Sequence, residues 1–365
     1  MLVNGKSYKT IWLDGSGKIK TVDQNLIPFK FRIISLKSSD DIANAIKKMT
    51  LRGAPIIGVA AAFGVYLSVK EGIKKAYSGR KLDNYVIKKS EKILKTRPTA
   101  INLKYAINRS LVAYNSEQEP DKKLEAVLKN AISISKEEEL ASYKIGQYGL
   151  KIIEDLYKRK KYKQINILTH CNAGWLACID YGTALAPIYF AKEKGIKMHV
   201  WVEETRPRNQ GAKLTAWELF HNNIPHTIIT DNAGGFIIQK GLVDLVIVGS
   251  DRTTIKGDVC NKIGTYKTAL AAYDNKIPFY VALPVSSLDI KIKDALNEIP
   301  IEEREEDEVK YITGYYNGIK KILISSPKSK AKNFGFDITP SRLVTALITD
   351  RGIIKPDIKQ IKKIL

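Results

Sequence analysis

The chain has 365 residues, of which 44% are hydrophobic and 27% charged, and it contains three cysteines. This composition is that of a globular protein, and it excludes disordered, fibrous and disulfide-scaffold classes. The 60 Lys and Arg residues outnumber the 38 Asp and Glu residues and give a net charge of +22. The lysines are scattered over every segment, and the dense run at 158–163 has no aromatic platform or reading helix beside it. Nucleic acid is therefore not an expected partner.

The sequence also argues against a membrane protein. Its N-terminal residues become polar at once, and its longest apolar stretch, residues 56–69, is shorter than the roughly 20 residues of a membrane-spanning helix. The cysteines show no CxxC spacing, so reduced thiols are expected. Together these features predict a soluble, cytoplasmic protein without a membrane partner.

The N-terminal third predicts a small antiparallel sheet followed by helices. DGSG at 14–17 indicates a hairpin turn between the β-prone runs 10–13 and 18–22. From residue 39 to 155 the apolar residues recur with a helical period. Five helices are predicted there, at 40–49, 55–72, 83–95, 99–114 and 121–157.

After residue 164 the pattern changes to alternating strands and helices. The predicted strands are 165–170, 197–204, 226–231, 242–251 and 279–284. Near-continuous apolar strands separated by helices are typical of a parallel sheet covered on both faces. We therefore predict an α/β protein with two domains. Residues 1–130 would form a small helical domain with a short antiparallel β addition, and residues 131–365 a Rossmann-like parallel-sheet domain.

Ligands of such a sheet bind outside the carboxyl ends of its strands. Polar or reactive residues follow every predicted strand, namely Cys171-Asn172, Glu203-Glu204-Thr205-Arg206, Asp231-Asn232, Ser250-Asp251-Arg252 and Ser286-Ser287. Cys171 is predicted at the start of the next helix, whose N–H groups would lower the pKa of its thiol. Burial would raise the pKa of the Asp251 carboxyl group and suit a general acid or base, although this residue could equally cap the following loop.

Other candidate sites are weaker. His170 precedes Cys171, but alternate strand residues face opposite sides of a sheet, so a Cys–His pair is not expected. Cys178 and Cys260 are interpreted as packing residues. The sequence contains no GxGxxG after the first strand, no GxxxxGK[ST], no HExxH and no paired CxxC, so neither a nucleotide cofactor nor a metal is expected.

Phosphate-binding candidates are more numerous. Arg52 and Arg97 each precede a predicted helix, where free N–H groups favour an anion. The segments 206–213 and 261–265 offer further donors. A surface ion pair remains the alternative for each arginine. Four such segments around one acid and one thiol predict a small phosphorylated, hydroxylated ligand.

Several motifs occur in one order along essentially the whole chain: RGAP-IIG, TRPTAINL, LTHCNAGWLA, ETRPRNQGAKLTAWEL, ITDNAGG, VGSDRT, GDVCNKIGTY, IPIEER and FDITP. Together they resemble the 5-methylthioribose-1-phosphate isomerase family. That family shares a superfamily with ribose-1,5-bisphosphate isomerase and with the regulatory subunits of a translation-initiation-factor exchange complex. THCNAG followed by GSDR and NKIGT is typical of the isomerases, because the regulatory subunits usually lack the cysteine and the aspartate.

The resemblance implies a cofactor-free, homodimeric aldose–ketose isomerase of methionine salvage, which converts 5-methylthioribose 1-phosphate to 5-methylthioribulose 1-phosphate. It implies that Asp251 is the proton donor, and that Cys171 removes the C2 proton or stabilises a hydride shift from C2 to C1. The substrate-binding residues that it implies are Arg52, Gly53, Ala54, Arg97, Gln210, Asn261 and Lys262. The pocket for the 5-substituent is expected in the helical domain, around residues 56–63.

Two alternatives remain open from the sequence. The first is a related isomerase that acts on ribose 1,5-bisphosphate or 5-deoxyribose 1-phosphate. The second is a non-catalytic protein similar to the initiation-factor regulatory subunits, which would not need Cys171 and Asp251 together.

Overall fold

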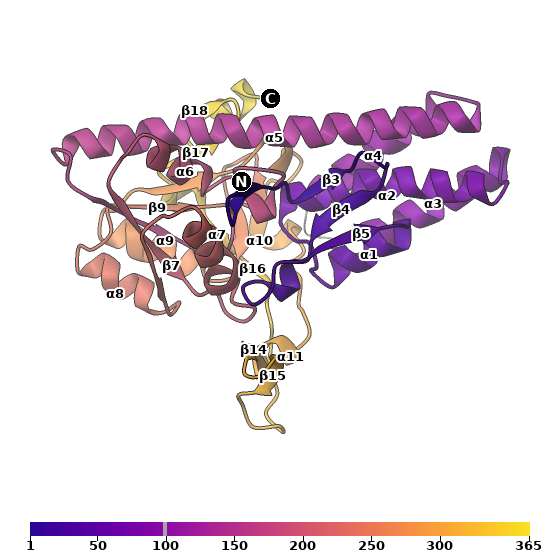
Figure 1. The fold of residues 1–365 in the computed structure, drawn as a ribbon. Coiled ribbons are helices and arrows are strands. Elements are labelled where there is room, and N and C mark those ends of the chain that lie inside the picture. The colour runs from indigo at the N-terminus through magenta and orange to yellow at the C-terminus, as the bar shows by residue number, and fades with distance from the viewer. Residues whose placement is uncertain (98–100) are drawn as a thin grey trace.

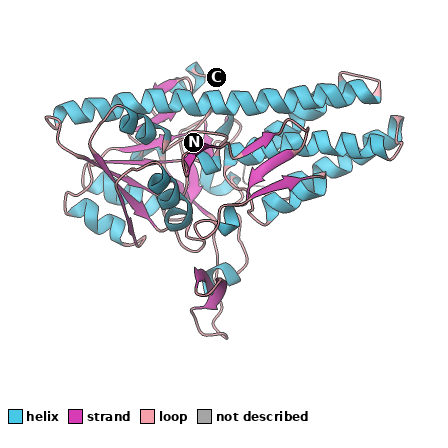
Figure 2. Ribbon diagram, viewed as in Figure 1, coloured by secondary structure: helices cyan, strands magenta, loops and turns pink. Residues whose placement is uncertain are grey.

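The computed structural model describes residues 1–97 and 101–365. One half of the molecule is mainly helical, and the other half contains most of the strands together with further helices (Figures 1 and 2). The predicted hairpin is confirmed, because β3 (Ile11–Leu13) pairs antiparallel with β4 (Ile19–Val22). In the turn, the Asp14 side chain accepts hydrogen bonds from the backbone N–H groups of Ser16 and Lys18. The remaining N-terminal strands are β1 (Leu2–Val3), β2 (Lys6–Ser7) and β5 (Ile33–Leu36).

All five predicted helices are present. They are α1 (Ser39–Lys47), α2 (Ala54–Lys74), α3 (Gly79–Leu94), α4 (Ile101–Asn115) and α5 (Pro120–Arg159). Residues 99 and 100 of the fourth prediction lie outside the described residues. α2 packs against α1, α3, α4 and α5, which explains why it is apolar on every face.

The apolar helix α2 is longer than the sequence predicted. By length and composition alone, its 21 residues are enough to cross a membrane. The prediction that the apolar segment is too short to span a membrane is therefore wrong. However, 83% of its most apolar window is buried inside the protein. Its apolar side chains are accounted for by the core of the helical half.

The 40-residue helix α5 joins the two halves of the molecule (Figure 1). Val127, Ala131 and Ile134 enter the core around α2, whereas Ile145 and Ile153 enter the core beside the sheet. The domain boundary predicted at 130/131 falls inside this helix. The division of the chain into domains there stays a prediction.

A seven-stranded sheet forms the second half, in the order β18-β17-β12-β9-β6-β7-β8. The five predicted strands are confirmed as β6 (Ile165–Thr169), β7 (Met198–Glu203), β8 (His226–Ile229), β9 (Leu245–Val248) and β12 (Phe279–Ala282). The sequence analysis missed β17 (Ala346–Thr349), which is parallel to β12, and the antiparallel edge strand β18 (Gly352–Ile354). Because β7 and β8 lie on one side of β6 and the later strands on the other, the chain order reverses between β6 and β9.

Helices cover both faces of this sheet. They are α6 (Ala186–Glu193), α7 (Ala216–His221), α8 (Ala233–Gln239), α9 (Thr265–Asp274) and α12 (Ile358–Lys363). Ile167 and Leu245 join the core that includes α5 and α6, whereas Leu168 and Val246 join the core that includes α8 and α9. Apolar side chains on both faces explain why the strands read as continuous apolar runs.

A smaller four-stranded sheet and a projecting arm complete the fold, and neither was predicted. The sheet contains β10 (Arg252–Thr254), β11 (Val259–Lys262), β13 (Leu288–Asp289) and β16 (Phe336–Thr339). The arm contains α11 (Asp307–Lys310), β14 (Tyr311–Tyr315) and β15 (Ile319–Leu323), and it follows the short helix α10 (Ala295–Glu298). In Figure 1 this arm projects from the body below the sheet.

Candidate active site

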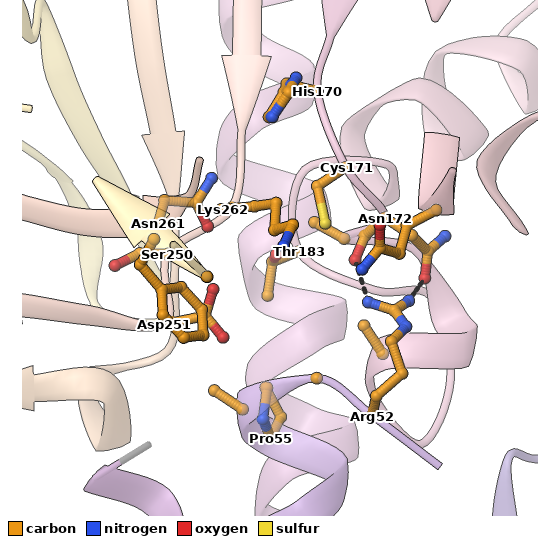
Figure 3. A pocket seen from close by; sticks show the side chains of 18 of the residues that line it. Arg52, Pro55, His170, Cys171, Asn172, Thr183, Ser250, Asp251, Asn261 and Lys262 are labelled. Carbon is orange, nitrogen blue, oxygen red and sulfur yellow. Dashed lines mark hydrogen bonds between the residues drawn. The ribbon is translucent and has the colours of Figure 1, made fainter. Parts of the chain in front are cut away.

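A cavity opens at the carboxyl ends of β6 and β9, where the strand order reverses (Figure 3). This is the position at which open α/β sheets bind ligands. Cys171 follows β6 and Asp251 follows β9, so two neighbouring strands bring these residues to one cavity. Its empty space, including the mouth, is about 700 Å³, which suits a small molecule.

The structure brings all nine predicted site residues together. All nine line the cavity, namely Arg52, Gly53, Ala54, Arg97, Cys171, Gln210, Asp251, Asn261 and Lys262. They come from the start of α2, the segment after α3, the ends of β6 and β9, the loop after β7, and β11. Their roles in binding and catalysis remain proposals.

The backbone at Cys171 is fixed by two threonines that follow β7, one in the loop and one at the end of the π-helical turn Gly211–Thr215. Its N–H donates to Thr205 Oγ1 at 2.8 Å, and its carbonyl oxygen accepts from Thr215 Oγ1 at 2.7 Å. Cys171 has a φ of 64°, in the left-handed region that non-glycine residues seldom adopt. The next α-helix, α6, begins only at Ala186. The prediction that Cys171 starts a helix is therefore wrong.

The charge environment of Cys171 also differs from the prediction. Burial raises the pKa of its thiol, and the carboxyl group of Asp251 acts in the same direction. Arg52, Lys262 and a hydrogen bond from the Asn172 N–H oppose this rise without cancelling it. The expected lowering of the pKa by a helix start is wrong, because desolvation penalises the thiolate and the following α-helix begins only at Ala186.

Asp251 lies across the cavity from Arg52 (Figure 3). Its N–H donates to the Cys260 carbonyl oxygen at 3.0 Å, which fixes its backbone beside β11. Burial raises the pKa of its carboxyl group, while Arg97, Arg52 and Lys262 oppose the rise. The predicted direction of this pKa shift is confirmed.

Arg52 is held by one neighbour, Asn172. Its guanidinium donates to the Asn172 carbonyl oxygen at 3.0 Å and also to the Asn172 side-chain oxygen. Only 7% of Arg52 is exposed, and among the described residues its Nε has no hydrogen-bond partner. The side chain is therefore fixed at the cavity wall, and its Nε–H group is available to a ligand.

The chain passes from Arg52 into α2 through Gly53. This glycine has a φ of 115°, and a Cβ atom there would lie 2.6 Å from the Ala177 carbonyl oxygen. Because the backbone at Gly53 approaches the segment after Cys171 this closely, only glycine fits at position 53. The first amides of α2, from Ala54 onward, thereby reach the cavity as potential anion donors.

The remaining polar residues approach the cavity from other elements. Arg97 Nε donates to Glu302 Oε2 at 3.0 Å, and its guanidinium lies 5.9 Å from the centre of the Phe336 ring. Pro98 of the predicted helix start lies outside the described residues. Lys262 reaches between Asp251 and Cys171 (Figure 3), and burial lowers its pKa.

Two amides complete the predicted set. Asn261 Nδ2 donates to Thr265 Oγ1 at 3.0 Å, which leaves its carbonyl group toward the cavity. Gln210 is buried, and its Oε1 has no hydrogen-bond partner among the described residues. An unsatisfied buried acceptor at a cavity wall is favourably placed to take a ligand hydroxyl group.

His170 was predicted not to pair with Cys171, and its ring nitrogens indeed contact other residues. Its Nδ1 lies 2.6 Å from Glu203 Oε2 and its Nε2 lies 2.9 Å from the Ile263 carbonyl oxygen. Both ring nitrogens thus face oxygen acceptors, and the pKa of His170 is raised, because the Glu203 carboxylate outweighs the opposing effect of burial. The imidazole anchors the turn that follows Lys262.

His170, Glu203 and Asp231 could also hold a metal ion, since one ligand atom of each lies within 4.8 Å of the others. Both ring nitrogens of His170 are already engaged, however. The two Asp231 oxygens accept from the backbone N–H groups of Thr205 and Arg206, at 2.7 Å each. These ligand atoms therefore serve the internal hydrogen bonds of the site.

Sequence reasoning missed Glu218, a fully buried carboxylate on α7. It accepts hydrogen bonds from Asn172 Nδ2 at 2.8 Å, from the N–H groups of Trp175 and Leu176 at 3.0 and 3.1 Å, and from the Tyr189 hydroxyl at 2.6 Å. A Cβ atom at position 174 would lie 1.8 Å from Glu218 Oε2, which explains the glycine there. The carboxylate thus holds the loop that carries Cys171, and through Asn172 it holds Arg52. A glutamate in the otherwise apolar run AWELF was the available signal.

Replacing Glu218 with alanine should destabilise the protein strongly. Four buried donors would lose their acceptor, so the free energy of unfolding should fall by about 3 kcal/mol or more. Urea unfolding followed by circular dichroism measures this change. Glu125→Ala, at an exposed position on α5, is the control and should shift the free energy by no more than about 0.5 kcal/mol. Equal midpoints for the two variants would contradict the role given to Glu218.

The apolar wall of the cavity is not where the sequence placed it. Residues 56–63 are buried in the core of the helical half, so the prediction that they form the 5-substituent pocket is wrong. In the described part of the chain, the apolar and thiol side chains at the cavity belong to Met49, Ala54, Pro55, Cys171, Ala173, Ala177, Cys178 and Phe336. The helical half contributes through the segment just before α2 and through the first residues of α2.

Comparison with known proteins gives a consistent result. Residues 50–356 match the profile of the initiation factor 2 subunit family. The chain is 48% identical to the methylthioribose-1-phosphate isomerase of Sulfurimonas denitrificans, over 98% of each chain. It is 50% identical to the protein of the same name from Sinorhizobium medicae, over 97% of this chain and 96% of the relative.

Solved structures share the whole fold. The crystal structure of 5-methylthioribose 1-phosphate isomerase from Pyrococcus horikoshii OT3 matches with a TM-score of 0.83 and 36% identity, over 98% of this chain and 96% of that one. The structure titled translation initiation factor eIF-2B, subunit delta, from A. fulgidus matches with a TM-score of 0.78 and 35% identity, over 98% and 99% of the two chains.

Proposed function

The chain belongs to the initiation factor 2 subunit family and, within it, to the methylthioribose-1-phosphate isomerases, and from this premise we propose how its cavity carries out the reaction. The protein is an aldose–ketose isomerase of methionine salvage, which converts 5-methylthioribose 1-phosphate to 5-methylthioribulose 1-phosphate. The observation that carries the proposal is the placement of Asp251 and Cys171 at the ends of neighbouring strands, facing one cavity.

Asp251 is the proton donor in this proposal. The anomeric oxygen of the substrate carries phosphate, so the sugar ring cannot open by loss of a hydroxyl proton. A protonated carboxyl group can instead give its proton to the ring oxygen as the bond from C1 to that oxygen breaks. Burial keeps the pKa of Asp251 above the ordinary carboxyl value, which supports the protonated form.

The phosphate group would be held by donors on the side of the cavity formed by α2. Arg52 and the first amides of α2 offer positive charge and N–H groups on that side, and Lys262 of β11 reaches into the same cavity. Asn261 and the unsatisfied Gln210 oxygen would receive the sugar hydroxyl groups. Arg97 also lines the cavity and is paired with Glu302.

Cys171 would act on C2 and C1. Because burial raises the pKa of its thiol, the ligand-free site favours the thiol over the thiolate. This favours the hydride shift over proton removal by a thiolate. The hydrogen on C2 then moves with its electron pair to C1. The 2-hydroxyl gives its proton to the Asp251 carboxylate left by ring opening as the C2 carbonyl forms, which restores the protonated acid.

The apolar wall supports methylthioribose 1-phosphate over ribose 1,5-bisphosphate. A methylthio group suits Met49, Pro55, Ala177 and Phe336, whereas a second phosphate would need free cations. Arg97 and Arg304 are the further guanidinium groups of the cavity, and Glu302 pairs with both, at 3.0 and 2.6 Å. The regulatory alternative does not require an acid and a thiol facing one cavity.

The experiment that tests this proposal is turnover by the purified protein. Without added metal or nucleotide, it should convert 5-methylthioribose 1-phosphate to a ketose phosphate, detected by the new C2 carbonyl signal in carbon NMR. An unchanged aldose spectrum at high protein concentration would contradict the proposal.

We also propose that the protein is a cytoplasmic homodimer that does not act through nucleic acid. α8 and α9 pack side by side and expose Phe236 and Tyr273, at 57% and 60%, together with Tyr266 and Leu270. Such an apolar face favours a second copy of the chain. The three free cysteines favour a reducing compartment. Light scattering tests the assembly, and the mass of a single chain would contradict it.

A further inference from the structure

A second chamber adjoins the active-site cavity. Its empty space, including its opening, is about 1,130 Å³. It lies between residues 24–27 and 48–52 of the helical half, the loop 207–214 and the projecting arm. Met49, Arg52 and Gln210 line both this chamber and the active-site cavity, so the two spaces meet at these side chains.

The charged residues of this outer chamber are not balanced. Arg208 pairs with Glu308 at 2.8 Å, and Lys321 pairs with Asp307 at 2.7 Å. These pairs neutralise both acidic residues of the chamber wall. Three cations remain, namely Lys48, Lys213 and Arg52, and in the described part of the chain none of them has a carboxylate ion-pair partner.

Lys213 is the most unusual of the three. It is half-buried, and no hydrogen bond or ion pair involves its ammonium group among the residues that the structure describes. Burial, reinforced by Arg208 and Arg206, lowers its pKa to about 8. A buried ammonium without a counterion is costly unless an anion neutralises it. The chamber therefore favours the binding of an anion from solution.

We propose that the outer chamber is an anion-collecting site for phosphate monoesters, with Lys213 as its central contact, and that it passes the phosphate group of the substrate to Arg52. This inference rests on the proposed function for the identity of the substrate. Lys48 attracts the incoming dianion at the exposed rim, Lys213 holds it within the chamber, and Arg52 receives it at the shared wall. Clefts lined by one sign of charge raise local substrate concentration in this manner.

Kinetics at two salt concentrations test the proposal. At low ionic strength, Lys213→Met should lower kcat/KM for methylthioribose 1-phosphate about tenfold, with kcat changed less than about twofold. In about 0.5 M salt the difference from the unmodified protein should nearly vanish, because screening removes the attraction. Lys213→Arg retains the charge and should stay near the unmodified protein. Lys276→Met, at an exposed position outside both chambers, is the matched control. An unchanged kcat/KM for Lys213→Met at low salt, or an equal loss at both salt concentrations, would overturn the inference.

A labelling experiment tests the chamber without turnover. Amines of the intact protein are acylated briefly near pH 8, and modification is mapped by peptide mass spectrometry. Inorganic phosphate should slow acylation of Lys213 severalfold relative to chloride at equal ionic strength, and should leave Lys276 unaffected. Equal acylation rates at Lys213 in the two salts would overturn the anion site. Protection of Lys213 in a protein that turns over no sugar phosphate would instead uphold the chamber and refute the proposed function.

Discussion

Asp251→Asn should lower kcat by about a thousandfold, with little change in substrate affinity. An amide fills the same space but cannot give a proton to the ring oxygen, and general acid catalysis contributes factors of about 10² to 10⁴. The measurement is steady-state turnover of methylthioribose 1-phosphate, with substrate affinity determined separately by calorimetry. Retention of a tenth of the turnover would remove Asp251 from the acid role.

The pH dependence provides a second check on Asp251. Its raised pKa means that the carboxyl group stays protonated to higher pH than an ordinary aspartate. Because the protonated form is the active one, kcat/KM should fall as pH rises through that raised value, and Asp251→Asn should lose this descending limb. Asp274→Asn, at an exposed position at the end of α9, should keep both the activity and the limb.

Cys171→Ser should lower kcat at least a hundredfold. The hydroxyl group is smaller and less polarisable than the thiol, and it cannot ionise at accessible pH, so it replaces neither form of Cys171. Turnover is measured per folded protein, with circular dichroism as the check on folding. Cys260→Ala removes a buried thiol of β11 that lies outside the cavity, and it should remain active. A serine variant within tenfold of the unmodified protein would exclude an essential thiol.

Two further measurements decide the form in which Cys171 acts. The raised pKa predicts slow alkylation by iodoacetamide at pH 7, with a rate that still rises above pH 9. In water, substrate deuterated at C2 should give a product that retains the deuterium at C1, because a hydride shift does not exchange with solvent. Alkylation that levels off below pH 7, together with loss of the label, would assign proton removal by a thiolate.

Local sequence patterns predicted the strands and helices well, because continuous apolar runs and helical periods depend on near neighbours. They also placed Cys171 and Asp251 at strand ends. The same patterns missed β17, a four-residue strand followed closely by an edge strand. They placed a helix start at Cys171, where the chain instead takes a left-handed conformation that hydrogen bonds from Thr205 and Thr215 stabilise.

The details of the site depend on contacts that no local pattern contains. Arg52 meets Asn172 across 120 positions of sequence, and Arg97 meets Glu302 across 205. The burial of Glu218 and the lack of an ion-pair partner for Lys213 among the described residues likewise follow from tertiary packing. Family motifs identified which residues gather at the cavity, but not how each is held or which cations are already neutralised.

Direct comparison of two sugar phosphates tests the central claim. The purified protein is given equal amounts of 5-methylthioribose 1-phosphate and ribose 1,5-bisphosphate in one reaction, and phosphorus and carbon NMR follow both ketose products. The apolar wall and the neutralised Arg97 and Arg304 predict that the methylthio sugar is consumed at least a hundredfold faster. Faster consumption of the bisphosphate, or no conversion of either sugar, would contradict the assignment.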